Sequence, residues 1–292
     1  MKWMMFIKHL QTLGLAGAGK AIKSLGFEGV DLTVRPAGSV LPENVRKDLP
    51  AAQKVFADLG LQVPLITTAI TNTRDPHVAD IFETAAACGI RELKLGYVGY
   101  KKFGSFHQVL ADTQKDLDGI TALAHSTGVR ANIHTHSGPY ISTNPAIVAQ
   151  LLKDRDPPSI GAYADPGHMT VEGSRDGWRQ GLDMLGSRIN LVAVKDLAWE
   201  EVDDQRLHKK RWQTRIVPLN RGAVAWPEVF ECLKQLNFNG WVSIHSEYQG
   251  AHTWKDLTVP EVIEQTRQDL AYLGEAVPDA KAPTAAATTQ RS

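Results

Sequence analysis

Short apolar segments alternate along this chain with longer amphipathic ones, and a glycine stands at most junctions where an amphipathic segment gives way to an apolar one. Cys88–Ile90 and Thr127–Val129 are two such junctions. A glycine just past a helix end adopts the left-handed conformation without a Cβ penalty, so each junction predicts the end of a helix and the start of a strand. The predicted strands are 3–8, 29–34, 62–67, 92–96, 129–134, 160–164, 189–194 and 241–246. The predicted helices are 15–25, 44–59, 76–88, 107–127, 144–153, 174–185, 226–236 and 260–275.

Strands that alternate with helices predict a parallel sheet covered by helices, which is an α/β fold. Eight repeats favour a closed (β/α)8 TIM barrel over an open doubly wound sheet. The glycines after the first strand, Gly14, Gly17 and Gly19, do not have the G-x-G-x-x-G spacing of a dinucleotide-binding fold. We expect one domain over residues 1–276 and a disordered tail over 277–292, because the tail has no apolar periodicity.

The composition is that of an ordinary globular protein. Of 292 residues, 43% are hydrophobic and 22% charged, and the formal net charge is zero. This balance argues against a nucleic-acid partner or an anionic membrane surface, and no apolar stretch of about 20 residues predicts a membrane span. The apolar run near the N-terminus is too short and too charged for a signal peptide, and Cys88 and Cys232 lack metal-like spacing. We therefore expect a cytoplasmic protein with free thiols; a homo-oligomer remains open.

The segment Val129–His136, V-R-A-N-I-H-T-H, brings two histidines to the end of the fifth predicted strand. Side chains on a strand alternate between faces, so Asn132, His134 and His136 share one face. Two histidines at this spacing can reach a common site. Taken alone, such a pair is more typical of a hydrogen-bonded rim than of a ligand set.

The next three strands also end in polar side chains. Asp165 and His168 follow strand six, Lys195 follows strand seven, and His245 and Glu247 follow strand eight. The carboxyl ends of barrel strands meet at one face, where TIM-barrel active sites lie. Imidazole and carboxylate groups from adjacent strands suit a divalent cation such as Mn²⁺, Co²⁺, Zn²⁺ or Mg²⁺. Other polar residues at strand ends, able to line a pocket, are Lys8, Lys94 and Tyr97, and Asp31 is expected to hold either the barrel floor or Arg35.

Two long connections follow strands and so lie on the same face. They span residues 96–106 and 196–226. The second is far longer than the usual connection of about 2–6 residues, and we expect it to be a mobile lid over the site. Its tryptophans, Trp199, Trp212 and Trp226, are able either to stack on a sugar or to pack within the protein.

The motifs D-P-G-H at 165–168, V-K-D at 194–196 and G-W-V-S-I-H-S-E at 240–247 resemble those of the xylose isomerase-like TIM barrels. This sugar phosphate isomerase/epimerase superfamily, of the AP endonuclease family 2 type, also holds inosose dehydratases, 3-keto-sugar enzymes and the endonuclease IV group. The resemblance covers roughly residues 3–275. It implies a metal held by an acid on strand five, an Asp on strand six, a His on strand seven and an acid on strand eight.

Asp165 and His168 fit the strand-six aspartate and the histidine that faces the substrate in this family. The positions of the two acids fall on His134 and His245, and the strand-seven ligand position falls on Ala193. The resemblance therefore implies a metal held by His134, Asp165 and His245. In family epimerases the two acids also move the proton, and a metal-bound imidazole has no lone pair for that task.

The resemblance implies a metal-dependent isomerase or epimerase that acts on a sugar, keto-sugar or cyclitol through an enediolate. The alternatives are a lyase or dehydratase on a keto-sugar or keto-glycoside, and a sugar- or metal-binding barrel without catalysis. The neutral charge disfavours a DNA-repair endonuclease.

The catalytic candidates are the ionisable groups beside the expected metal. A cation lowers the pKa of a neighbouring lysine, so we expect Lys195 to act as the general base. Glu247 is expected to orient the substrate or to be a fourth ligand, and His136 and His168 are the next candidates for the base.

Overall fold

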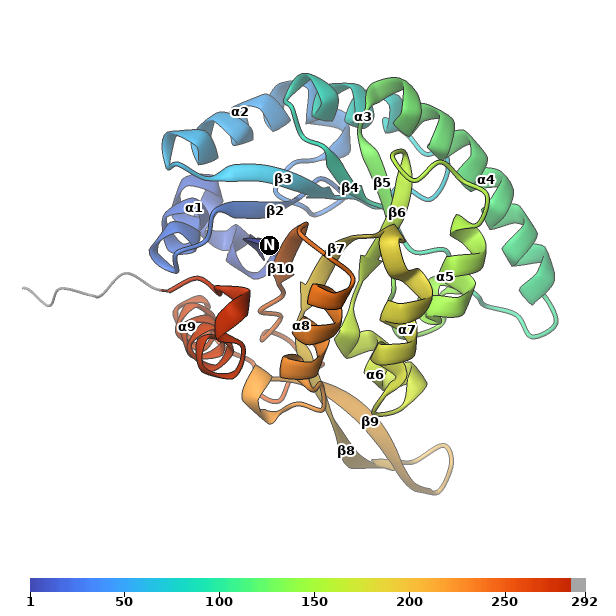
Figure 1. Cartoon of the computed structure of the whole chain (residues 1–292), viewed down its shortest axis with the longest axis vertical. Coiled ribbons are helices and arrows are strands. Elements are labelled where there is room, and N and C mark those ends of the chain that lie inside the picture. The colour runs from blue at the N-terminus through green and yellow to red at the C-terminus, as the bar shows by residue number, and fades with distance from the viewer. Residues whose placement is uncertain (285–292) are drawn as a thin grey trace, which may run out of the picture.

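Eight parallel strands form a closed barrel in the computed structural model, which describes residues 1–284 (Figure 1). The strands follow one another round the barrel in the order β1-β10-β7-β6-β5-β4-β3-β2. They are β1 (Lys2–Phe6), β2 (Gly29–Thr33), β3 (Gln62–Thr67), β4 (Glu92–Lys94), β5 (Arg130–His134), β6 (Ile160–Ala164), β7 (Ile189–Val194) and β10 (Trp241–Ile244). Each coincides with one predicted strand, so the (β/α)8 prediction is confirmed.

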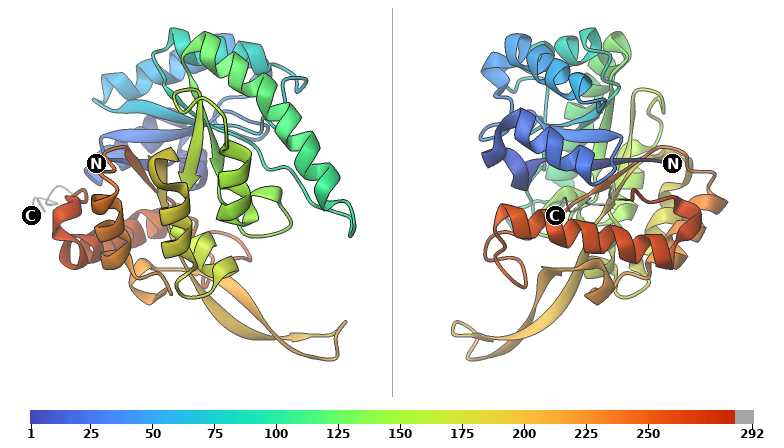
Figure 2. Two further views of the ribbon diagram at one scale, coloured as in Figure 1. Left: turned by 45° about the vertical axis from the view of Figure 1, so that its right-hand side comes forward. Right: turned by 90° about the vertical axis from the view of Figure 1, so that its left-hand side faces the viewer.

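Helices surround the barrel (Figure 2). They are α1 (Gly14–Ser24), α2 (Val45–Asp58), α3 (Val78–Ala87), α4 (Phe106–Thr127), α5 (Pro145–Leu152), α6 (Pro166–Gly173), α7 (Gly177–Leu185), α8 (Trp226–Gln235) and α9 (Val259–Ala276). The sequence analysis missed α6 and predicted α7 three residues too early. Several helix starts have the expected chemistry: Asn144 caps α5 ahead of Pro145, and Thr258 and Glu261 form a capping box on α9.

The main apolar core lies between the strands and the helices. Strands such as β2 and β6 are buried at every position, as expected of a parallel sheet covered on both faces. A second, smaller cluster joins side chains from four strands: Met4, Leu65, Tyr163, Leu191 and Ala193. Tyr163 connects this cluster to the polar site, because its hydroxyl bonds to groups there.

The long connection after β7 is an ordered β-hairpin. Strands β8 (Asp196–Asp204) and β9 (Lys209–Val217) pair antiparallel and protrude from the barrel (Figures 1 and 2). Leu197 and Ile216 anchor the base in a cluster with Tyr248 and other residues. No residue of the hairpin lines the pocket described below. Its closure over the site as a lid stays a prediction.

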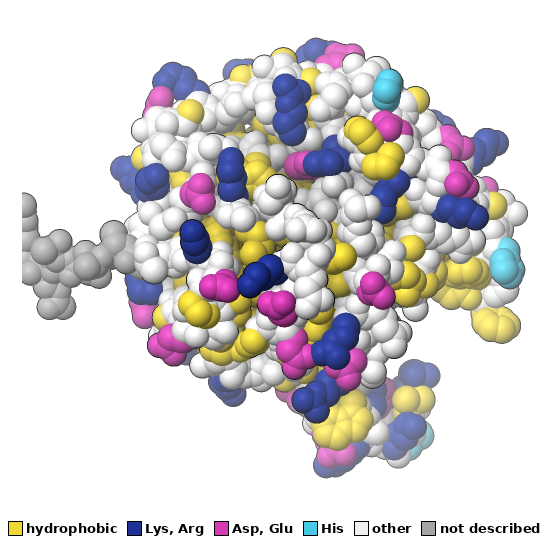
Figure 3. Space-filling model, in the orientation of Figure 1, with side chains coloured by type: hydrophobic (Ala, Val, Ile, Leu, Met, Phe, Trp, Pro, Cys, Tyr) yellow, Lys and Arg dark blue, Asp and Glu magenta, His cyan; other side chains and the backbone are white. Residues whose placement is uncertain are grey.

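The three tryptophans of this connection have different environments. Trp226 is buried at the start of α8, where its indole Nε1 donates to Asp196 Oδ2 at 2.9 Å, so this residue packs within the protein. Trp199 and Trp212 are exposed on the hairpin. On the face seen in Figure 3, charges of both signs are interspersed, in keeping with the net charge of zero.

Asp196 holds the hairpin to α8. Its Oδ1 accepts from the backbone N–H groups of Leu197, Ala223 and Val224 at 2.8–3.1 Å. Burial raises the pKa of this carboxyl to about 7, although the hydrogen bonds favour the charged form. Gly222 packs directly on it, because a Cβ built there would lie 1.9 Å from Asp196 Cγ.

Gly222→Ala is therefore expected to destabilise the protein. Overpacking typically costs about 1–3 kcal/mol, and here the added methyl would also displace a carboxyl that holds several donors. The measurement is the free energy of unfolding in urea. Gly173→Ala is the matched control, because a Cβ at Gly173 meets no atom within 4 Å. Equal stability of the two variants would contradict the packing role of Gly222.

The first residues of the expected tail are ordered against the barrel. Pro278–Ala280 form a short 3-10 helix, and Trp3 Nε1 donates to the Ala280 carbonyl at 3.0 Å. Residues 285–292, the rest of that prediction, lie outside the described residues. Cys88 and Cys232 are free and half-buried. Within residues 1–284, none of the helices has the length and apolar character needed to span a membrane.

Candidate active site

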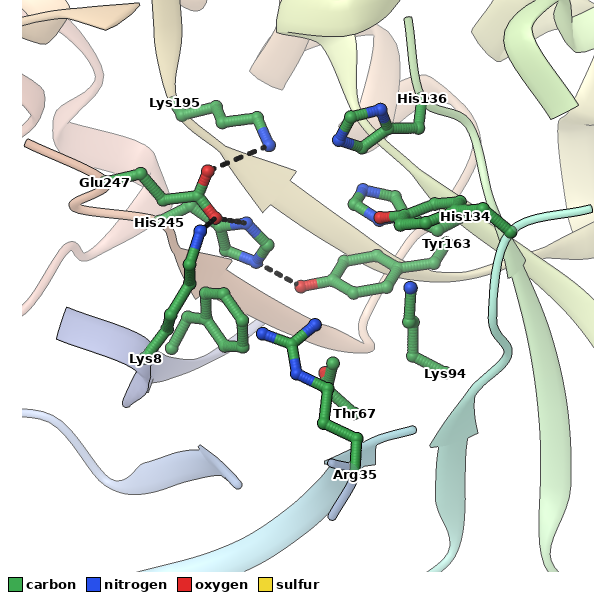
Figure 4. A pocket seen from close by; sticks show the side chains of 12 residues that line it. Lys8, Arg35, Thr67, Lys94, His134, His136, Tyr163, Lys195, His245 and Glu247 are labelled. Carbon is green, nitrogen blue, oxygen red and sulfur yellow. Dashed lines mark hydrogen bonds and ion pairs between the residues drawn. The ribbon is translucent and has the colours of Figure 1, made fainter. Parts of the chain in front are cut away.

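A pocket of about 110 Å³ opens at the carboxyl ends of the barrel strands (Figure 4). The sequence analysis placed the polar strand ends here, and the structure brings most of them together. The lining residues are Phe6, Lys8, Arg35, Thr67, Lys94, Tyr97, His134, His136, Tyr163, Lys195, His245 and Glu247. Four of these are lysine or arginine side chains, while Glu247 is the one carboxylate among them.

Asp165 is the buried anion beneath the pocket. It is the N-cap of α6, where Oδ1 accepts from the backbone N–H of His168 at 3.0 Å. Its Oδ2 lies 3.2 Å from Lys195 Nζ and 3.2 Å from His134 Nε2. Burial alone would raise the pKa of this carboxyl, but Lys195 and neighbouring groups outweigh burial and lower it. Asp165 is therefore ionised.

Lys195 is buried and stays protonated. Its Nζ lies 3.2 Å from Asp165 Oδ2 and 3.8 Å from Glu247 Oε2. Burial on its own lowers the pKa of this lysine, but the two carboxylates outweigh burial and raise it. This raised pKa speaks against the expected role of Lys195 as the general base, which stays a prediction. Its charged neighbours in the structure are the carboxylates of Asp165 and Glu247, so Lys195 is a buried positive charge and hydrogen-bond donor.

Both ring nitrogens of His134 are occupied. Nε2 lies 3.2 Å from Asp165 Oδ2, and Nδ1 lies 2.8 Å from the Tyr97 hydroxyl. An ionised carboxylate only accepts, so Nε2 bears the proton and Nδ1 accepts from Tyr97. Burial, followed by Lys195, lowers the pKa of this imidazole well below its usual range. His134 is thus a neutral, fully hydrogen-bonded side chain.

His245 has one free ring nitrogen. Its Nε2 lies 2.8 Å from the oxygen of the Tyr163 hydroxyl. That hydroxyl donates its proton to Asp31 Oδ2 at 3.3 Å. Its buried Nδ1 has no hydrogen-bond partner among residues 1–284 and lies 4.0 Å from Glu247 Oε1. The ring stacks on Phe6 with centroids 4.7 Å apart. The orientation of the ring is fixed, and Nδ1 is left for a ligand.

Asp31 holds the floor of the barrel, the first of the two roles that the sequence analysis left open. Its carboxylate accepts from Thr67 Oγ1 at 2.6 Å and from Ser243 Oγ at 3.2 Å, in addition to Tyr163. These bonds tie β2 to β3, β10 and β6. Asp31 therefore orients His245 through Tyr163.

His136 and His168 form a second imidazole pair, with ring centroids 3.8 Å apart. His136 Nδ1 donates to the Ser137 carbonyl at 2.8 Å, which leaves Nε2 for the pocket. Burial, followed by Lys195, lowers the pKa of His136 to about 4, so this ring is neutral. His168 Nδ1 bonds to Ser137 Oγ at 2.7 Å, but His168 does not line the pocket.

The sequence analysis did not single out Tyr163 and Arg35 as site residues. Tyr163 lies two positions before Asp165, so strand alternation places both on one face and was a usable signal. Arg35 follows β2 and lies with its Cζ 5.9 Å from the Phe6 ring centroid.

Lys94, which the sequence analysis named, is buried, and its Nζ lies 3.5 Å from the Tyr97 ring centroid. Burial, followed by the charge of Arg35, lowers the pKa of Lys94 well below its usual range.

The donors present do not fit a divalent metal. Of the expected ligands, Asp165 binds Lys195, His134 has both nitrogens committed, and His245 presents only Nδ1. Ala193 offers no donor at the strand-seven position. Across residues 1–284, no group of three or more His, Cys, Asp or Glu side chains is placed to hold a metal ion.

Residues 20–275 match the family described as xylose isomerase-like TIM barrel, and the chain belongs to this family. Solved structures agree with the fold. An L-ribulose 3-epimerase has a TM-score of 0.72 and 16% identity over 96% of each chain. The 3-keto-D-glucoside 4-epimerase YcjR from E. coli has a TM-score of 0.67 and 13% identity over 92% of this chain and 98% of that one.

A probable 3-DHS dehydratase from Bacillus anthracis also superimposes, with a TM-score of 0.67 and 14% identity over 93% of this chain and 99% of that one. A comparison with curated proteins finds no sequence relative. At these identities the similarity establishes the fold, and the function has to be argued from the site.

Proposed function

We propose that this barrel is an epimerase or isomerase of a keto-sugar, which moves a proton on the carbon next to the carbonyl. The observation that supports the proposal most directly is a pair of imidazole nitrogens, His136 Nε2 and His245 Nδ1, which have no hydrogen-bond partner among residues 1–284 and share the pocket with the buried ammonium of Lys195. The folds of an L-ribulose 3-epimerase and a 3-keto-D-glucoside 4-epimerase agree with this chemistry by analogy.

Epimerisation needs a base on one face of the carbon and an acid on the other. His136 and His245 come from different walls of the pocket, the loop after β5 and the end of β10 (Figure 4). One of them must begin protonated. We assign the acid to His245, because Glu247 Oε1 lies 4.0 Å from its Nδ1 and Asp31 Oδ2 lies 3.7 Å from its Nε2. His136, with its low pKa, is the neutral partner.

The proposed step balances as a proton transfer. His136 Nε2 takes the proton from the carbon, the C–H electrons form the C=C bond of an enediolate, and the negative charge collects on the former carbonyl oxygen. His245 Nδ1–H then returns a proton to the opposite face of the same carbon. The reverse reaction, or exchange with water, restores the two imidazoles. Positioned acid–base groups of this kind contribute about 10²–10⁴-fold each.

The test is turnover in D₂O with L-ribulose, D-fructose, D-psicose, D-tagatose and a 3-keto-glucoside. We expect one of these to give an epimer or isomer that carries a single deuterium at the reacting carbon, as read by NMR. A His136→Gln/His245→Gln double variant, purified in the same way, controls for contaminating isomerases. Absence of exchange with every sugar would contradict the proposal, and a product that has lost water would instead identify a dehydratase.

A further inference from the structure

We infer that the Lys195 ammonium takes both the place and the task that a divalent metal has in the family ligand pattern, so that this barrel works without a metal. The inference rests on the proposed function, because it names the charge that stabilises the oxyanion of that reaction. It goes beyond that function by removing the metal requirement expected from the sequence motifs.

The position of the ammonium supports this. Asp165 occupies the strand-six ligand position, and the cation found against its Oδ2 is Lys195 Nζ, at 3.2 Å. Glu247, at the end of β10, approaches the same ammonium at 3.8 Å. Lys195 comes from the strand whose ligand position is Ala193.

The balance of charge also argues against an added divalent ion. Lys8 and Arg35 line the same pocket as Lys195. Replacing the two family acids by His134 and His245 removes two negative charges, which is consistent with a site that holds a singly charged ammonium. A metal bound to Asp165 would lie beside Lys195 in a buried environment, where like charges repel strongly.

The ammonium is also suited to the chemistry. A lysine side chain has three N–H donors. Asp165 Oδ2 lies within reach of one of them at 3.2 Å, and Glu247 Oε2 at 3.8 Å is beyond hydrogen-bond distance, so the ammonium keeps donors for the oxygen on which negative charge develops. Donors fixed in a buried site before the reaction are the most effective means of stabilising such an oxyanion. The Lys195 side chain is 2% exposed, so the ammonium is largely removed from bulk solvent.

Two variants separate the charge from the packing. Lys195→Met keeps the length of the side chain and removes the charge, and we expect a loss of about 10²–10³-fold in kcat with a small change in KM. Lys195→Arg keeps the charge and should recover part of that loss. The thermal midpoint of each variant is measured alongside. An Arg variant that folds and is no more active than a folded Met variant would overturn the role of the charge.

The wild-type enzyme supplies the decisive measurement, which does not depend on how any variant folds. Elemental analysis of the purified protein is expected to show divalent metal far below one equivalent. Calorimetric titration with Mn²⁺ and with Co²⁺ should give no binding heat, and chelator should leave turnover unchanged. One tightly bound metal per chain, or turnover lost to chelator and restored by Mn²⁺, would overturn the inference. A protein that binds no metal and turns over no sugar would instead count against the proposed function alone.

Discussion

Replacing His245 by Gln is expected to reduce epimerisation by about 10²–10⁴-fold while the protein still exchanges one substrate proton with solvent. The reason is that His245 and His136 approach the reacting carbon from different walls of the pocket. In His245→Gln the neutral His136 still removes the proton and can return it, or a deuteron, on its own side. The configuration is then kept, and the label enters the unchanged sugar. NMR of the starting sugar in D₂O measures both rates at once.

His136→Gln is the matched variant. In His136→Gln, the remaining base is His245. Exchange should therefore survive only in the epimer whose C–H faces His245, whereas in His245→Gln it survives only in the epimer whose C–H faces His136. Each sugar is therefore tested with both variants, which gives a pattern of four exchange rates. If both variants lose exchange with both epimers to the same extent, a single base acts, and the two-base assignment is wrong.

The barrel was predictable because its signals are local. Glycine at the helix C-termini and apolar strands recur in each repeat, and every predicted strand is found. Helix α6 was missed although Asp165 and Pro166 are a typical cap and first residue, because the sequence analysis assigned Asp165 to the metal and His168 to the substrate. The structure shows that Asp165 both caps a helix and binds Lys195.

The candidate residues were also predictable, whereas their roles were not. The polar residues that follow the strands were expected at the carboxyl end of the barrel, and the structure places His136, Asp165, Lys195, His245 and Glu247 there. The hydrogen bonds of each depend on contacts between distant segments, such as Tyr97 with His134 and Tyr163 with His245. The sign of the pKa shift at Lys195 follows from two carboxylates on other strands. No pattern within one segment contains that information.

Asp165→Asn is expected to destabilise the protein by about 3–5 kcal/mol, because it leaves the buried Lys195 ammonium without its nearest carboxylate. The amide keeps the size of the side chain, and its oxygen can still cap α6 at the His168 N–H. Its NH₂ group would then face Lys195 Nζ and the Nε2–H of His134, so donors would meet donors. Turning the amide to relieve this contact would give up the cap.

Urea unfolding at neutral pH measures the effect, and Glu247→Gln is the control. Glu247 lies 3.8 Å from Lys195, is 13% exposed, and faces Lys8 as well. Its neutral variant should therefore lose much less stability than Asp165→Asn, since water can reach the exposed part of the group and screening weakens such a pair. If the two variants lose equal stability, the anchor of the ammonium is shared between the carboxylates. In that case Asp165 does not have the dominant role that its full burial and its 3.2 Å contact assign to it.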